Sequence, residues 1–143
     1  MRPDAARFSF PPGFLWGAAT SAHQVEGGNT LNDWAVWEAG GHVRVAAGLA
    51  CDHFHRFRED FELAKDLGHN AHRFSLEWSR IEPEPGRYSD EALQHYRDVL
   101  EALRARGLEP VVTLHHYTIP RWLAEQGGWD HGGMERHFLR YVK

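Results

Sequence analysis

The segment HFHRFREDFELAKDLGHNAHRFSLEWS, residues 53–79, contains one helix followed by one strand and decides the fold class. The apolar residues of its first part recur at the spacing of a single helical stripe, at Phe54, Phe57, Phe61, Ala64 and Leu67. Gly68 follows this stripe, in the position that glycine commonly takes just after a helix. The second part, NAHRFSLEWS, then reads as a strand that ends in polar and aromatic residues.

The same pattern recurs downstream in SDEALQHYRDVLEALRARG, residues 89–107, and EPVVTLHHYTIP, residues 109–120. Ser89 is a plausible N-cap, Gly107 ends the helix, and the stripe comprises Leu93, Tyr96, Leu100 and Leu103. An earlier segment, FLWGAATSA, gives a further strand, and GGMERHFLRYVK begins another helix with Met134, Phe138 and Tyr141 on one face. Strands separated by helices of this length need crossover connections, so the sequence predicts an α/β fold with three parallel strands.

Composition excludes several classes of protein. The 143 residues fit one domain, and 42% hydrophobic residues suffice for a packed core. A net charge of −4 with interspersed charges is unlike a nucleic-acid-binding surface. No apolar run is long enough to span a membrane and the N-terminal residues lack an apolar signal core, so we expect a cytoplasmic protein with no membrane contact. The single cysteine, Cys51, cannot form an internal disulfide, and we expect it to be a small buried residue.

The eleven histidines raise the question of a metal. His53 and His55 lie two positions apart, and His69 and His72 lie three apart, but no H-E-x-x-H pattern or Cys/His cluster is present. The glycine pairs form no phosphate-binding G-x-G-x-x-G motif and indicate turns. The sequence therefore predicts no metal site.

Four segments in order carry a family resemblance: FLWGAATSAHQVEGG (14–28), CDHFHRFREDFELAKDLG (51–68), HRFSLEWSRIEP (72–83) and VVTLHHYTIPRWLAEQGGW (111–129). Together they resemble the N-terminal third of glycoside hydrolase family 1, the β-glucosidase-like family. The resemblance implies a (β/α)₈ TIM barrel that hydrolyses β-glycosides with retention. Residues 1–143 would then be the N-terminal segment of a single barrel domain. They would form its first three βα units and be incomplete on their own, because about eight strands are needed to close a barrel.

The resemblance also implies roles for individual residues. Gln24 and His116 match residues that hydrogen-bond the glycone hydroxyls, and Arg73 matches an arginine beside the catalytic nucleophile. Tyr117 stands where the family usually has tryptophan, which keeps an aromatic face but changes its polar group. These residue types suit a sugar, because sugars present hydroxyls to amides and imidazoles and apolar C–H faces to aromatic rings.

Each residue also has an alternative interpretation. Gln24 could cap a loop, His116 could be one of two strand histidines that alternate with His115, and Arg73 could pair with a helix carboxylate. Most of the tryptophans suit core or rim packing, and Trp78 is expected to be structural. Only Trp34 and Trp37, in a loop-like stretch after the first strand, are candidates for contacts to the aglycone.

Retaining hydrolysis needs two carboxyl groups about 5–5.5 Å apart. In the family these lie in an Asn-Glu-Pro motif after the fourth strand and in a Glu-Asn-Gly motif far downstream, and neither motif occurs in this sequence. The resemblance therefore implies that both catalytic glutamates lie outside these residues. It also implies no cofactor, because carboxylates alone carry this reaction. Glu26 and Glu77, each near a predicted strand end, form the other carboxylate pair to consider.

Three hypotheses follow. In the first, the chain is a segment of a β-glycosidase that a second polypeptide completes, and the isolated chain is inactive. In the second, it is a noncatalytic protein that covers its open sheet edges by self-association and at most binds sugars weakly. In the third, Glu26 and Glu77 act as a catalytic pair within the isolated chain.

Overall fold

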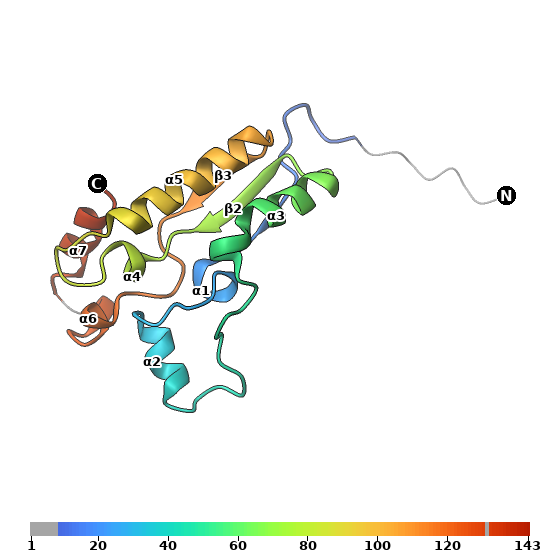
Figure 1. The fold of residues 1–143 in the computed structure, drawn as a ribbon. Helices are drawn as coiled ribbons and strands as arrows, with labels where there is room; N and C mark the ends of the chain where they lie inside the picture. The colour runs from blue at the N-terminus through green and yellow to red at the C-terminus, as the bar shows by residue number, and fades with distance from the viewer. Residues whose placement is uncertain (1–8, 131) are drawn as a thin grey trace.

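The computed structural model describes residues 9–130 and 132–143. At its centre is a three-stranded parallel sheet in the order β1-β2-β3 (Figure 1). The strands are β1 (Gly17–Ala19), β2 (Ala71–Ser75) and β3 (Glu109–Thr113). Their register aligns Ala19 with Arg73 and Arg73 with Val111, so these residues share one face of the sheet. The predicted α/β class and the three parallel strands are confirmed.

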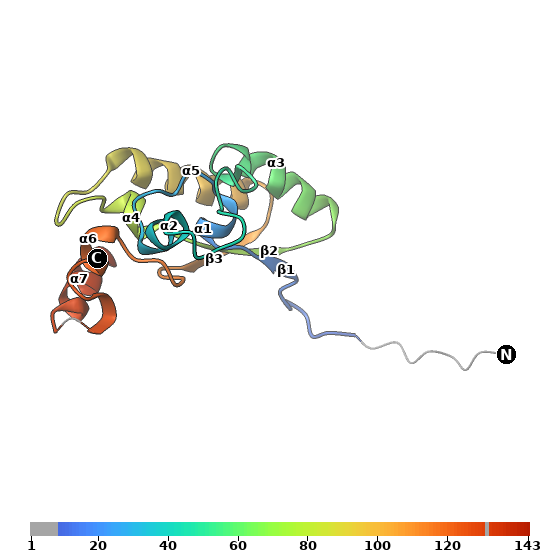
Figure 2. The ribbon, with the colours of Figure 1, turned by 90° about the horizontal axis from the view of Figure 1, so that it is seen from below.

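Two long helices make the crossover connections. α3 (His53–Asp66) joins β1 to β2 and α5 (Asp90–Ala105) joins β2 to β3. Both lie on the same side of the sheet (Figure 2). The shorter elements follow the strands or end the chain: α1 (Ala22–Val25), α2 (Asp33–Ala39), α4 (Trp78–Ile81), α6 (Arg121–Ala124), the 3₁₀ turn η1 (Gly128–Asp130) and α7 (Met134–Tyr141).

The predicted helix ends are confirmed by the backbone. The Ser89 hydroxyl accepts a hydrogen bond from Ala92 N at 3.1 Å, as an N-cap should. Gly68 and Gly107 both have positive φ, at +82° and +64°, directly after α3 and α5. Residues with a side chain seldom adopt this conformation, so glycine stops each helix and lets the chain turn into the next strand.

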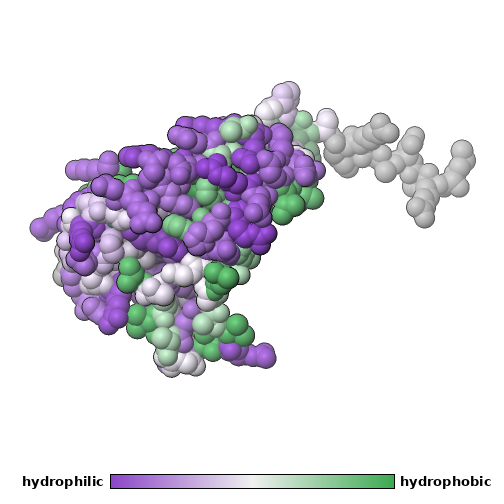
Figure 3. Space-filling view, viewed as in Figure 1, coloured by the Kyte–Doolittle hydropathy of each residue, from purple (hydrophilic) through white to green (hydrophobic). Residues whose placement is uncertain are grey.

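The core lies between these helices and the sheet. Phe57, Phe61 and Leu103 pack there with Phe74 of β2, and Trp78 is 1% exposed, which confirms its structural role. The opposite surfaces of α3 and α5 are mostly hydrophilic (Figure 3). This is the division between faces that the helical stripes predict.

Three predictions are wrong in detail. Cys51 is exposed rather than buried, because it lies in the turn before α3 and outside the core. Leu67 is 76% exposed, because it caps α3 beyond the last turn that faces the sheet. The stretch after β1 that contains Trp34 and Trp37 is the helix α2 and not a loop; Asn32 begins it by accepting a hydrogen bond from Ala35 N at 2.8 Å.

No helix among the described residues covers the second face of the sheet (Figure 2). All of β1 is exposed, and Val111 of β3 is 42% exposed. No helix among residues 9–130 and 132–143 is long and apolar enough to cross a membrane. A cytoplasmic location stays a prediction.

Gly17 permits the close approach of β1 to β2. A Cβ at this position would lie 2.2 Å from the carbonyl oxygen of Ala71, which belongs to the neighbouring backbone and cannot move aside cheaply. We therefore expect Gly17→Ala to lower the free energy of unfolding by about 1–3 kcal/mol in urea titrations. The matched control is Gly132→Ala, where the new Cβ meets no atom within 4 Å. Equal stability of the two variants would contradict this account of the sheet.

Burial of His72 makes stability depend on pH. The ring packs 5.2 Å from the Phe61 ring, and burial, with nearby His53 and His69, lowers the pKa of His72 to about 4, whereas Asp60 opposes the shift. The unfolded chain takes up this proton near pH 6.5, so the free energy of unfolding should fall as the pH drops from 6.5 to about 4. His72→Phe should flatten the fall by up to about 1 kcal/mol per pH unit. Gln126→Ala, which replaces an exposed side chain without a titratable group, should leave the slope unchanged, and an unaltered slope in His72→Phe would disprove the assignment.

Candidate functional site

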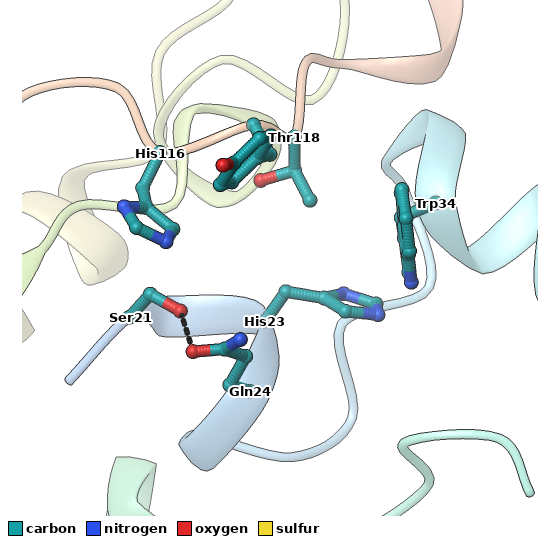
Figure 4. Close-up of a pocket in the computed structure, with 7 residues that line it drawn as sticks. Ser21, His23, Gln24, Trp34, His116 and Thr118 are labelled. Atoms are coloured by element: carbon teal, nitrogen blue, oxygen red, sulfur yellow. Dashed lines mark hydrogen bonds between the residues drawn. The ribbon is translucent and has the colours of Figure 1, made fainter.

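A hollow of about 200 Å³ lies where the chain leaves β1 and β3 (Figure 4). Its walls come from the segment 21–24 with α1, from α2, and from the segment 116–118 after β3. The lining residues are Ser21, His23, Gln24, Trp34, His116, Tyr117 and Thr118. Parallel strands end at the same edge of a sheet, which is why segments so far apart in the sequence meet there.

Gln24 is held in one orientation by its neighbour. The Ser21 hydroxyl donates a hydrogen bond to Gln24 Oε1 at 2.6 Å (Figure 4). Because the amide oxygen is engaged, the amide nitrogen is the group that can donate to a ligand. Gln24 lies on the helical turn α1, which follows β1, and its side chain lines the hollow.

His23, which the sequence analysis did not assign to the site, forms the wall beside Gln24. Asn32 Nδ2 donates to His23 Nδ1 at 3.0 Å, and the amide cannot be reversed because Asn32 Oδ1 accepts from Ala35 N. The other ring nitrogen, Nε2, must then carry the proton that bonds Glu38 Oε1 at 3.2 Å. The N-cap of α2 thus also fixes this histidine. The pair Asn32-Asp33 ahead of an apolar stretch is the signal that could have revealed it.

His116 and Tyr117 lie in a tight turn after β3, not within the strand. Thr118 N donates to His116 O at 2.9 Å, and Tyr117 between them has a left-handed backbone with φ of +66°. Tyr117 is 77% exposed. Burial, with the charge of Arg73, lowers the pKa of His116, so its ring is neutral at neutral pH and can both donate and accept a hydrogen bond. His115 packs aside against Trp129, with ring centroids 5.0 Å apart.

Two loops are joined across the hollow. Asp33 N donates to Ile119 O and Ile119 N donates to Asp33 Oδ1, both at 3.0 Å. These bonds hold Trp34 opposite the turn after β3. Trp37 does not line the hollow, but its ring lies 5.1 Å from the ring of Trp34, and both indoles are partly exposed.

Arg73 lies at the middle of β2. Its Nη1 donates to the carbonyl oxygen of Thr20 at 2.7 Å. Within the part of the chain that the structure describes, it makes no ion pair with a carboxylate, so the alternative of a helix ion pair is wrong for these residues.

Glu26 and Glu77 are buried beneath the hollow and do not line it. Glu26 accepts hydrogen bonds from Arg80 Nε at 2.9 Å and from the Tyr96 hydroxyl at 2.8 Å. Burial raises the pKa of Glu26, although Arg80 opposes the shift. Glu77 accepts from the hydroxyls of Ser79 and Thr118. Both carboxylates therefore serve structural hydrogen bonds, and the geometry does not support them as a catalytic pair.

The hollow combines an amide donor, a neutral imidazole and two aromatic side chains. Such a set can hydrogen-bond to a small polyhydroxylated molecule and stack against it.

Ser21 and Thr118 also line the hollow and were not assigned from the sequence. Nothing in the sequence pattern distinguishes these short hydroxyl residues, near Gln24 and His116, from ordinary turn residues. Among the described residues, no group of three or more His, Cys, Asp or Glu side chains could hold a metal ion.

Comparisons with known proteins find relatives in sequence and in fold. A beta-glucosidase named Beta-glucosidase 11, from Arabidopsis thaliana, is 42% identical over 96% of this chain and 28% of its own length. The apo structure of a beta-glucosidase, 1317, superposes with a TM-score of 0.86 at 52% identity, over 91% of this chain and 33% of that one. A beta-glycosidase from Pyrococcus horikoshii superposes with a TM-score of 0.88 at 43% identity, over 93% of this chain and 31% of that one.

The chain thus spans about a third of the length of the relatives it matches. The family model for glycosyl hydrolase family 1 matches residues 6–143, almost the whole sequence. The resemblance found in the sequence is confirmed, and the chain belongs to glycosyl hydrolase family 1.

Proposed function

We propose that these residues are the first three βα units of a (β/α)₈ barrel and supply part of the glycone site of a retaining β-glycosidase. One observation carries the proposal: Gln24, on α1 after β1, and His116 and Tyr117, in the turn after β3, line one hollow. Barrel enzymes place their chemistry at this end of the strands. Residues 1–143 are then the N-terminal segment of one barrel domain.

Each side chain has a role that its environment favours. The Gln24 amide nitrogen donates to a glycone hydroxyl, because its oxygen is already bound by Ser21. The neutral ring of His116 donates to one hydroxyl and accepts from another. Tyr117 and Trp34 offer aromatic faces to the C–H groups of the sugar, and Trp37, in contact with Trp34, extends this surface towards the aglycone.

Covalent chemistry would come from other residues. A retaining mechanism needs one carboxylate nucleophile and one carboxylic acid about 5–5.5 Å apart. We propose that both belong to barrel segments beyond these three units, in a longer chain or in a second polypeptide. Arg73 has no carboxylate partner among the described residues and would stabilise the ionised nucleophile.

The sugar site is tested by NMR titration of this chain with glucose and with galactose. We expect shifts confined to the residues of the hollow, and about tenfold weaker binding in Gln24→Ala and in His116→Ala, since each loses a hydrogen bond to the ligand. Gln126→Ala is the matched control, because this exposed glutamine lies outside the hollow. Shifts elsewhere, or equal affinity in all variants, would refute the assigned roles.

Assembly is tested by a native mass spectrum of the protein purified from its own cells. We expect the 16.4 kDa of these residues within a larger chain or complex that cleaves 4-nitrophenyl β-glucoside, whereas the 143-residue chain alone is inactive. The exposed edge strands β1 and β3 favour pairing with further strands, either of the same chain or of another polypeptide. A homo-oligomer without turnover would instead support the noncatalytic alternative.

A further inference from the structure

Glu77 is a fully buried carboxylate, with 0% exposure, and it does not itself line the hollow. Its Oε1 accepts from the Ser79 hydroxyl at 2.7 Å, and its Oε2 accepts from the Thr118 hydroxyl at 3.0 Å. Its backbone N donates to the Tyr96 oxygen at 2.9 Å. The side chain therefore bridges the segment after β2 and the segment after β3.

Thr118 connects this bridge to the hollow. Its side chain binds Glu77, while its backbone N donates to His116 O and closes the turn around Tyr117. Tyr117 has a left-handed backbone, which costs a residue with a side chain about 1–2 kcal/mol. A turn of this kind persists only if its surroundings hold it, and the hydrogen bond to Glu77 anchors it from below.

We propose that Glu77 is a positioning residue for the sugar pocket: through Thr118 it holds the turn 116–118 and so sets where the side chains of His116 and Tyr117 lie. The sugar-binding part of this inference rests on the proposed function. The anchoring itself is a property of the fold.

A carboxylate suits this place for two physical reasons. Leaving a buried carboxyl oxygen without a donor costs free energy, so the hydrogen bond from Thr118 resists breaking and can offset the strain in the turn. Its two oxygens also reach in two directions, whereas an apolar side chain of equal volume would fill the space without joining the two segments. Tyr96 extends the connection to Glu26, so that the turn is held relative to the end of β1 as well.

The test removes one hydroxyl from each end of the bridge. Thr118→Val deletes the hydroxyl that donates to Glu77 Oε2. Ser79→Ala deletes the hydroxyl that donates to Glu77 Oε1, where the backbone N of Ser79 remains a donor at 3.4 Å, and Ser79 does not line the hollow. We expect the backbone amide at position 118 to exchange its hydrogen about tenfold faster in Thr118→Val, and at the wild-type rate in Ser79→Ala. Unchanged exchange in Thr118→Val, or equal acceleration in both variants, would overturn the proposal.

Glu77→Met removes the acceptor of the same hydrogen bond, whereas Thr118→Val removes its donor, and it keeps the length of the side chain. If this variant folds, the amide at position 118 should exchange as fast as in Thr118→Val, and the double variant should be no faster than either, because the hydrogen bond between Thr118 and Glu77 is lost in all three. Additive acceleration would mean that Glu77 and Thr118 act separately, which contradicts the proposal.

A glucose titration of the same proteins separates the anchor from the proposed function. If both hold, Glu77→Met weakens glucose binding by about tenfold and Ser79→Ala does not. If the wild-type chain binds no glucose while exchange at position 118 still responds to Thr118→Val, the proposed function fails and the anchor stands. If glucose binds and exchange does not respond, the anchor fails alone.

Discussion

A buried chain of hydrogen bonds through Glu26, Tyr96 and Glu77 connects the segments that follow the three strands. The Tyr96 hydroxyl donates a hydrogen bond to Glu26 and accepts one from the backbone N of Glu77. One side chain of α5 therefore joins the segment after β1 to the segment after β2. Burying carboxylates is costly unless they are hydrogen-bonded or paired. Arg80 pairs with Glu26, and burial raises the pKa of Tyr96, which keeps its hydroxyl protonated as donor. The walls of the hollow depend on this chain of contacts.

Parallel pairing alone would not build such a site. The sheet brings the ends of β1 and β3 to one edge, with β2 between them, but it leaves the direction of each following segment open. Cross-links supply that direction: Asp33 with Ile119 above the strand ends, and Thr118 with Glu77 below them. The first fixes the wall that carries Trp34, and the second fixes the turn that carries Tyr117. The sheet, together with α2 and the turn 116–118 that these contacts hold, forms the hollow.

This division explains what the sequence could predict. The helical stripes, Ser89 as N-cap and Gly107 as helix stop are local signals, and the convergence of Gln24 and His116 follows from parallel strand ends. The contacts of Glu77 with Thr118 and of Tyr96 with Glu26 span 41 and 70 positions and leave no periodic trace. The exposure of Leu67 and the left-handed turn at Tyr117 likewise depend on tertiary context. The helix α2 is different, because Asn32 and Gly40 bracket it as cap and stop signals that were visible in the sequence.

The same contacts separate recognition from chemistry. A catalytic carboxylate must face the substrate and be free to gain or lose a proton or to form a covalent bond. Glu26 and Glu77 do not line the hollow, and each one has oxygens that already accept hydrogen bonds from structural donors. The Arg73 guanidinium, in contrast, donates to the carbonyl of Thr20 and pairs with no carboxylate among the described residues. Its positive charge lies on the face of the sheet shared with Ala19 and Val111. Under the proposed function, that charge is where a carboxylate from the remaining barrel is most favoured, because a nearby cation stabilises the ionised form.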